Sequence, residues 1–285
     1  MRKRGAEAGC GGGVRKRGAE AGGDLTSSVD AQVMLKERQR PRIDVAALPA
    51  AGADGGLRRG CPAFPAWPGS MAFMRDWLEW HAAYDDPVSA LSARLDRVSA
   101  HLARAIDQAP AGRVALVSLC AGQGRDVLGV LPGHPRSGDV AAVLVESDPR
   151  NAELARRRAA AAGLAQVDVR QADASRPAQF ADALPADILL LCGIFGNVSA
   201  GDIRRTAAAA PALCSAGATV IWTRHRRPPD LTPQVREWFT AAGFDEVAFD
   251  ALDTSILTAV GVGRLRAGVP AAALPAQPLF AFGQS

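Results

Sequence analysis

Apolar runs alternate with helical patterns along most of the chain, and this alternation limits the fold more than any other feature. Four runs are almost continuously apolar: residues 114–119, 140–145, 187–192 and 218–223. Strands of this kind are buried on both faces, which is typical of a mostly parallel sheet with helices on either side. The last two runs, at residues 244–249 and 256–265, have no helix between them. They can pair only as an antiparallel hairpin or else lie apart.

The helices are predicted from apolar spacing and from Gly and Pro at their ends. Expected helices span residues 72–84, 88–109, 151–162, 177–184, 202–214 and 232–242, and a further strand spans 166–170. The first helix carries Phe73, Trp77, Trp80 and Tyr84 on one face. A packing element explains this aromatic face most simply, and a lid over a site is the alternative.

A glycine turn follows the first apolar run. Cys120-Ala121-Gly122-Gln123-Gly124 ends the strand, and a helical pattern begins at once with Arg125. Glycine lets the backbone turn tightly and approach a ligand closely. In an α/β protein such a turn usually forms the floor of a cofactor site at the carboxyl ends of the strands. A plain strand-to-helix connection has the same pattern, and a glycine pair alone does not separate the two.

Glu146 stands at the end of the next strand, where an acid that binds a ribose is expected. A carboxylate that caps the following helix would occupy the same place. The dinucleotide fingerprint G-x-G-x-x-G is incomplete, because Val127 stands where the third glycine should be. The combination favours a nucleoside-bearing cofactor other than NAD or FAD.

With these motifs, residues 113–265 resemble the class I S-adenosylmethionine-dependent methyltransferases, and most of all uncharacterised bacterial members that carry SLCAGQGRD. The stretch from Ser118 to Gly124 is similar to their first motif, acidic-x-Gly-x-Gly-x-Gly, with Ser118 in the acidic position and Cys120 in place of the first glycine. The resemblance implies a Rossmann-like, doubly wound, mostly parallel sheet with an antiparallel terminal strand, preceded by N-terminal helices. It also implies S-adenosyl-L-methionine as cofactor.

The cofactor-binding residues follow from that resemblance. They are Ser118, Cys120, Ala121, Gly122, Gly124, Asp126, Glu146, Asp173 and Cys192. Glu146 matches the acid that binds the ribose, and Asp173 matches the polar residue near the adenine. Because Ser118 lacks a carboxylate, we expect Asp126 to meet the ammonium group of the cofactor while Arg125 stays on the surface.

Methyl transfer from a sulfonium is a direct displacement, so alignment of the acceptor with the methyl group supplies most of the catalysis. His225 is the best-placed histidine for a base, although a solvated loop residue has the same pattern. Phe195, Asn197 and Arg224 are expected to bind the substrate. Arg224, Arg226 and Arg227 would suit a carboxylate or phosphate on the acceptor, and a solvated basic loop is the commoner case. We expect a small-molecule acceptor.

Two other functions stay open at this point. One is an RNA methyltransferase that uses the Arg224–Arg227 loop, and the other is a binding module with this fold but without catalysis. Residues 71–285 hold nearly equal numbers of acidic and basic side chains, which disfavours nucleic acid as a partner. The Asn/Asp-Pro-Pro-aromatic tetrad of amino-directed DNA methylases is missing after residue 192. The oligomeric state is left open.

The excess positive charge lies in residues 1–70, which contain RKRGAEAG twice and all the lysines of the chain: Lys3, Lys16 and Lys36. We expect this segment to be disordered, as a basic tail or as an extension upstream of a start at Met71 or Met74. The expected organisation continues with N-terminal helices at 71–112, the cofactor-binding core at 113–270 and a C-terminal tail at 271–285.

Composition excludes several classes of protein. The cysteines show no CxxC or Cys/His ligand spacing, so neither a metal site nor a disulfide framework is expected. No apolar stretch approaches the roughly twenty residues that span a bilayer. The N-terminus has no apolar segment typical of a secretory signal. A cytoplasmic location with no membrane partner is therefore expected.

Overall fold

The computed structural model describes residues 76–270 and 272–282. The predictions for residues 1–70, for Phe73 and for starts at Met71 or Met74 lie outside these residues. The strands are β1 (Val114–Leu119), β2 (Val140–Glu146), β3 (Val167–Gln171), β4 (Ala186–Leu191), β5 (Cys214–His225), β6 (Phe244–Leu252) and β7 (Thr258–Leu265). The α-helices are α2 (Trp77–His81), α3 (Ala90–Gln108), α4 (Arg125–Val130), α5 (Pro149–Ala161), α6 (Ala200–Leu213) and α7 (Thr232–Ala241).

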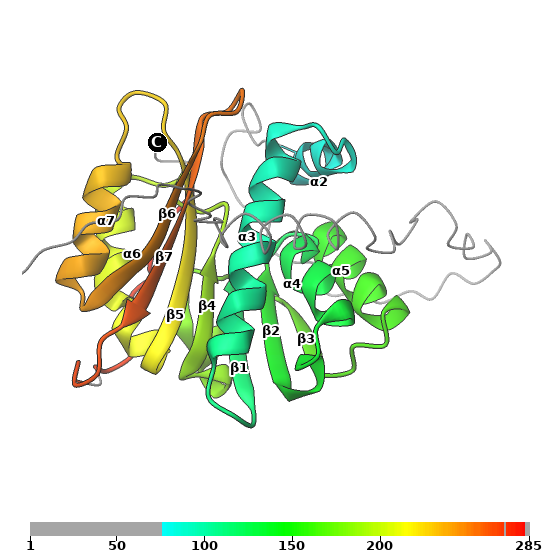
Figure 1. Ribbon diagram of the computed structural model, residues 1–285, viewed down its shortest axis with the longest axis horizontal. Coiled ribbons are helices and arrows are strands. Elements are labelled where there is room, and N and C mark those ends of the chain that lie inside the picture. Colours follow the sequence, from blue (N-terminus) through cyan, green and yellow to red (C-terminus); the bar gives the residue numbers. More distant parts are fainter. Residues whose placement is uncertain (1–75, 271, 283–285) are drawn as a thin grey trace, which may run out of the picture. The chain divides into compact units, whose positions relative to one another are not determined.

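The strands form one seven-stranded sheet in the order β3-β2-β1-β4-β5-β7-β6 (Figure 1). The first five strands run parallel, and β7 lies antiparallel to both β5 and β6. The predicted Rossmann-like sheet with an antiparallel terminal strand is therefore confirmed. β1 lies between β2 and β4, so the glycine turn that follows β1 emerges at the middle of the sheet edge.

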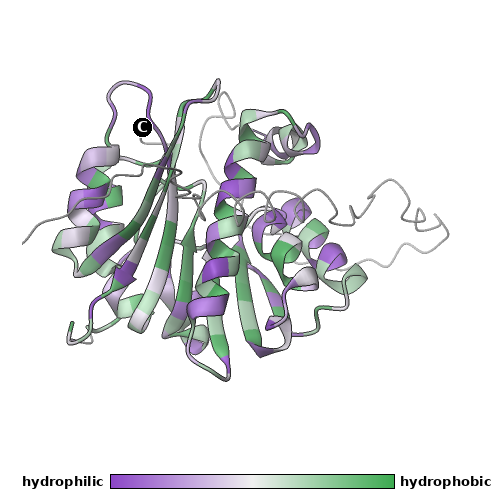
Figure 2. Ribbon diagram, viewed as in Figure 1, coloured by the Kyte–Doolittle hydropathy of each residue, from purple (hydrophilic) through white to green (hydrophobic). Residues whose placement is uncertain are grey.

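Helices cover the sheet on both faces, as the apolar strands require. α3, α4 and α5 pack on one face through residues such as Leu102, Val127 and Ala152. α6 and α7 pack on the other through Ile203 and Phe239. The inner strands β1, β2 and β4 between them are largely hydrophobic along their length (Figure 2).

α3 is held firmly at its middle and at its end. His101 of this helix is buried and forms a hydrogen bond with Asp250 of β6. At the C-terminal end, Arg136 Nη1 donates to the carbonyls of Ile106 (2.6 Å) and Ala109 (2.8 Å). These bonds cap the end of the helix, where backbone carbonyls lack the full set of intrahelical partners.

Some predicted element bounds were wrong. α3 begins at Ala90 instead of 88, because the Ser89 side chain accepts a hydrogen bond from Ser92 N and caps the helix; Val88 is 89% exposed. Residues 177–184 form two short 3₁₀ turns, Pro177–Gln179 and Ala181–Ala183, in place of one helix. Pro185 disfavours helical backbone at the residue before it.

The segment near the C-terminus packs into the core. Leu279 and Phe280 are buried. Leu279 N donates to Ser175 O at 2.8 Å, and Thr206 Oγ1 donates to Leu279 O at 3.0 Å. In the described part of the chain, none of the helices combines the length and apolar character needed to cross a bilayer.

Candidate functional site

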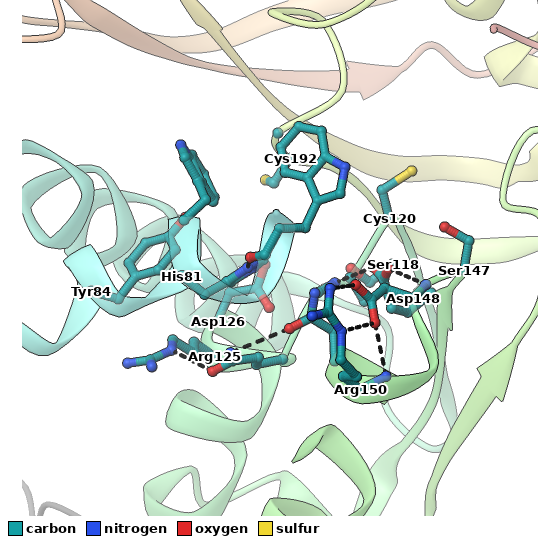
Figure 3. A pocket seen from close by; sticks show the side chains of 18 of the residues that line it. His81, Tyr84, Ser118, Cys120, Arg125, Asp126, Ser147, Asp148, Arg150 and Cys192 are labelled. Carbon is teal, nitrogen blue, oxygen red and sulfur yellow. Dashed lines mark hydrogen bonds and ion pairs between the residues drawn. The ribbon is translucent and has the colours of Figure 1, made fainter. Parts of the chain in front are cut away.

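A cavity of about 560 Å³, here called the first pocket, opens at the carboxyl ends of β1, β2 and β4. Its walls come from the glycine turn, from the residues after β2 and β4, and from residues 77–85, here called the aromatic segment, which begin with α2. Figure 3 shows this aromatic segment, with His81 and Tyr84, on one side of the cavity and Cys120 and Ser147 across from it. The volume is within the roughly 300–1,000 Å³ typical of small-molecule sites.

Glu146 is bound to the glycine turn at the floor of the first pocket. Its Oε2 accepts a hydrogen bond from Gly122 N at 2.7 Å, and its Oε1 accepts one from Asp148 N at 2.8 Å. Burial raises the pKa of this carboxyl group, while the two backbone amides oppose that shift. Gly122 has a φ of +56°, a left-handed conformation that favours glycine.

A second carboxylate, Asp126, lies at the start of α4. Asp126 is buried, lines the pocket and accepts a hydrogen bond from Val127 N at 2.8 Å. Burial raises its pKa, and the positive charge of Arg94 acts in the opposite direction. Glu146 and Asp126 thus give this pocket two buried acceptors that a ligand with hydroxyl or ammonium groups can use.

Arg125 does not stay on the surface as expected. Its side chain is only 18% exposed and lines the first pocket. Nη1 donates to Asp85 at 2.7 Å, and the guanidinium lies 5.5 Å from the centre of the Tyr84 ring. Because Asp85 and Tyr84 come from the aromatic segment, Arg125 ties that segment to the glycine turn.

The aromatic segment covers the first pocket. Trp77, Trp80, His81 and Tyr84 line it, and Phe282 joins them with its ring 6.1 Å from that of Trp77. The His81 ring lies directly against Gly122, so a Cβ at position 122 would overlap it. Burial lowers the pKa of His81, and the charges of Arg125, Arg158 and Arg94 lower it further, against a backbone hydrogen bond that raises it.

Among the described residues, one buried polar side-chain atom of this wall has no hydrogen-bond partner. Asn151 lines the first pocket, and its side-chain oxygen accepts from Gln123 Nε2 at 3.3 Å. Its Nδ2 is buried and makes no hydrogen bond among the described residues. Buried donors are nearly always paired, so this atom marks a place where a ligand acceptor would fit.

Most of the predicted cofactor-binding residues meet in the first pocket. Those in its wall are Ser118, Cys120, Ala121, Gly122, Asp126, Glu146 and Cys192. Gly124 and Asp173 are not among its lining residues. Gly124 precedes α4 with a φ of +64°, and Asp173, 49% exposed, accepts from Ser175 N and pairs with Arg176. Both residues have a local structural explanation.

A cavity of about 390 Å³, here called the second pocket, adjoins the first. Trp80, Arg94 and Gly193 line both cavities. Three predicted residues lie in the second pocket: Asn197, Arg224 and His225. His225 is the last residue of β5, whereas it was expected just beyond the strand. Burial, together with the charges of Arg224 and Arg227, lowers its pKa.

Phe195 was expected to bind substrate, but the structure places its side chain in the core. Its side chain is fully buried and lines neither pocket. The ring packs 6.3 Å from that of Trp222 and 6.2 Å from that of Phe239, on the side of the sheet that α6 and α7 cover. The loop after β4 therefore turns its aromatic side chain into the core.

Several wall residues were not singled out from the sequence as site residues. They are His81, Arg94, Asn151 and Phe282. The clustered aromatic residues at 77–84 were the one available signal, since a lid was the alternative to simple packing. Phe282 reaches the pocket only through tertiary packing. Asn151 lies in the first turn of α5, soon after Glu146, but an Asn there matches no motif considered in the sequence.

Comparisons with known proteins support the fold. No protein-family model and no curated protein sequence matches the chain. An O-methyltransferase family protein from Burkholderia thailandensis superposes with a TM-score of 0.52 and 18% identity, over 68% of this chain and 61% of that chain. The match thus covers less than two thirds of the Burkholderia protein.

Magnesium protoporphyrin IX methyltransferase from Synechocystis PCC 6803, solved with bound SAH, also has a TM-score of 0.52. Its identity is 11%, over 66% of this chain and 93% of that chain. At such identities the likeness is one of fold. The chain has the Rossmann-like fold of these methyltransferases.

Proposed function

We propose that the protein is an S-adenosyl-L-methionine-dependent methyltransferase that acts on a small molecule. The observation that carries this proposal is the hydrogen bond from Gly122 N to Glu146, which sets a buried carboxylate on the glycine turn inside the first pocket. The shared fold supports it, because a structural neighbour with that fold was solved with bound SAH.

The residues of the first pocket fit this cofactor. Each Glu146 oxygen accepts one backbone amide and keeps a lone pair for a ribose hydroxyl. Asn151 Nδ2 supplies the unpaired buried donor, and Asp126 supplies a negative charge for the ammonium group. When bound, S-adenosyl-L-methionine provides a methyl group on a positively charged sulfur.

The second pocket is the proposed acceptor site. It meets the first pocket along Trp80, Arg94 and Gly193, so an acceptor there lies next to the cofactor. The chain's main task is to hold the attacking atom in line with the methyl group. His225 is the proposed base, since its lowered pKa leaves the imidazole neutral near pH 7 and able to take the acceptor's proton.

The size and charge of the second pocket favour a small acceptor. Its volume of about 390 Å³ suits a small molecule. Arg226, the middle arginine of the loop, pairs with Asp253 and is not among the residues that line this pocket. The loop therefore does not present all its arginines together, which disfavours a continuous phosphate-binding surface for RNA.

Isothermal titration calorimetry of the full chain tests the cofactor. We expect S-adenosyl-L-methionine to bind and NAD not to bind. Glu146→Gln should weaken binding by about ten- to a hundredfold, or roughly 1–3 kcal/mol, because the ribose hydroxyls lose a charged acceptor. Glu153→Gln is the matched control, since Glu153 is half-exposed on α5 and lines neither pocket.

Two results would overturn the proposal. If the folded parent does not bind S-adenosyl-L-methionine, this molecule is not the cofactor. If Glu146→Gln and Glu153→Gln lose the same affinity for it, Glu146 does not bind its ribose. Transfer of labelled methyl groups then separates the remaining functions. Methylation of total RNA but not of small-molecule extracts would identify an RNA methyltransferase, and cofactor binding without any transfer would identify a binding module.

A further inference from the structure

The wall of the second pocket is positively charged. Arg94, Arg224 and Arg227 line it, and no Asp or Glu is among its described lining residues. Arg94 also reaches the first pocket, where it lies near the Asp126 carboxylate. The charges that belong to the second pocket alone are therefore those of Arg224 and Arg227.

Arg224 is buried with an incomplete set of partners. The residue is 7% exposed, and Nη1 donates to the carbonyl of Phe195. Its Nε is buried and has no hydrogen-bond partner in the described part of the chain. Because a guanidinium cannot lose its proton in a protein, burial of this charge without an anion is costly.

The neighbouring arginines differ in their partners. Arg226 donates to Asp253 and lies outside the second pocket. Arg227 lines that pocket, is exposed, and forms no ion pair with a carboxylate of the described residues. Asp230 is close enough to influence Arg224, but its Oδ1 accepts hydrogen bonds from Thr232 N (2.8 Å) and Oγ1 (2.7 Å).

A second unpaired nitrogen lies beside these arginines. His225 Nδ1 is buried and has no hydrogen-bond partner among the residues that the structure describes. His225 and Arg224 are adjacent residues of β5, and both contribute to the second pocket. A buried guanidinium nitrogen without a partner and a surface arginine without an ion pair among the described residues indicate a missing group in this cavity that is rich in oxygen and negatively charged. His225 Nδ1 is a further polar atom that such a group could contact.

We propose that the methyl acceptor carries a carboxylate or phosphate group, which Arg224 and Arg227 bind in the second pocket. This inference rests on the proposed function. The planar guanidinium of Arg224 presents Nε and Nη donors in a fork that suits either oxyanion. Trp80, Leu91 and Ile256 provide an apolar surface for the rest of the acceptor.

The test uses ¹⁹F NMR titrations of the full chain with three probes: 4-fluorobenzoate, 4-fluorophenyl phosphate and the neutral 4-fluorobenzamide. We expect one or both anions to bind, and the amide to bind at least about tenfold more weakly. The anion that binds more tightly tells carboxylate from phosphate. Arg227→Gln should weaken anion binding about tenfold or more, and Arg224→Gln should do the same.

Arg226→Gln is the matched control, because it removes the same charge from the same loop but outside the pocket. It should change anion binding by less than about twofold. Arg227 is exposed, so Arg227→Gln decides the question even if Arg224→Gln does not fold. Equal binding of anions and amide, equal losses in Arg226→Gln and Arg227→Gln, or no anion binding at millimolar concentration would each overturn the inference.

The same samples are titrated with S-adenosyl-L-methionine. If the parent binds the anions but not S-adenosyl-L-methionine, the methyltransferase proposal is overturned. The anion that binds in the second pocket is then not part of a methyl acceptor. Cofactor binding without anion binding overturns only the inference. The two failures are therefore distinguishable.

Discussion

The two pockets differ in how their charged side chains are held. In the first, Glu146 accepts hydrogen bonds from the backbone amides of Gly122 and Asp148, and Asp126 accepts one from the amide of Val127. In the second, Arg224 Nε and His225 Nδ1 are buried without hydrogen-bond partners among the described residues. The first pocket is thus largely preorganised, with Asn151 Nδ2 as its one unpaired buried nitrogen among the described residues. The second is completed only by what binds in it.

Because of this difference, the two pockets do not define the chemistry of their ligands equally narrowly. A carboxylate that the backbone already satisfies fits many ligands with hydroxyl groups. A buried guanidinium without an anion fits few, because it requires negative charge. The acceptor can therefore be described chemically from the second pocket, whereas the identity of the cofactor rests on the first pocket and on the fold.

Among the variants that test this difference between the pockets, Gly122→Ala is expected to change ligand affinity most. The left-handed backbone at this residue costs a non-glycine residue about 1–2 kcal/mol, and the new Cβ would overlap the His81 ring. We expect S-adenosyl-L-methionine affinity to fall at least about a hundredfold by calorimetry. Binding of the fluorinated anions in the second pocket should not change.

Gly129→Ala is the control for this variant. Gly129 lies in α4, and a Cβ there would meet nothing within 4 Å. Its affinity for the cofactor should equal that of the parent. A parallel loss of anion binding in Gly122→Ala would show that the two pockets do not act separately.

A smaller effect is expected from Phe282→Ala. Phe282 lines the first pocket only and packs edge-on against Trp77 and Phe280. Aromatic pairs of this kind contribute about 0.5–1.5 kcal/mol, so cofactor affinity should fall by about two- to tenfold. Val247→Ala, at an exposed residue that lines neither pocket, should leave it unchanged. Unaltered affinity in Phe282→Ala would remove this residue from the cofactor site.

The smallest effect is expected from the histidine of each pocket. Burial lowers the pKa of His81 and of His225, so both bind a proton less readily in the folded state. Their contribution to the unfolding free energy is therefore complete above the unfolded pKa of about 6.5 and is lost as the pH falls through it. His81→Gln and His225→Gln should flatten this decline in urea denaturation between pH 7.5 and 5.5.

The buried carboxyl groups change the unfolding free energy in the opposite direction as the pH falls. Burial raises the pKa of Glu146 and Asp126, so their contribution favours the folded state as the pH falls. Each histidine variant is therefore compared with the parent at the same pH, where the carboxyl contributions cancel. A decline as steep in both variants as in the parent would contradict the assignment to the histidines.

The sequence predicts the sheet and the first pocket's floor because both depend on local patterns. Apolar runs define the strands, and the carboxyl ends of parallel strands share one sheet edge, which brings Gly122 and Glu146 together. The ribose role of Glu146 and the base role of His225 remain predictions. Asp173 and Gly124 were predicted to bind the cofactor from the family motif alone, and neither lines the first pocket.

The rest depends on contacts between distant segments. Phe195 was misplaced because the sequence does not show which side of a loop faces the core. His81 reaches Gly122 through docking of the aromatic segment, 41 residues away along the chain. Leu279 and Phe280 lie in a stretch rich in Pro and Ala that has no periodic pattern, yet they are buried against α6 and the residues after β3.

In mechanical terms α3 is a lever. The helix has 19 residues, and Arg94 in the wall between the pockets lies about 21 Å along its axis from Gln108 at the far end. A tilt of about one degree at that end would move Arg94 by about 0.4 Å. Arg136 fixes the far end through the carbonyls of Ile106 and Ala109. Arg136, which lines neither pocket, thus holds the end of the helix that carries Arg94.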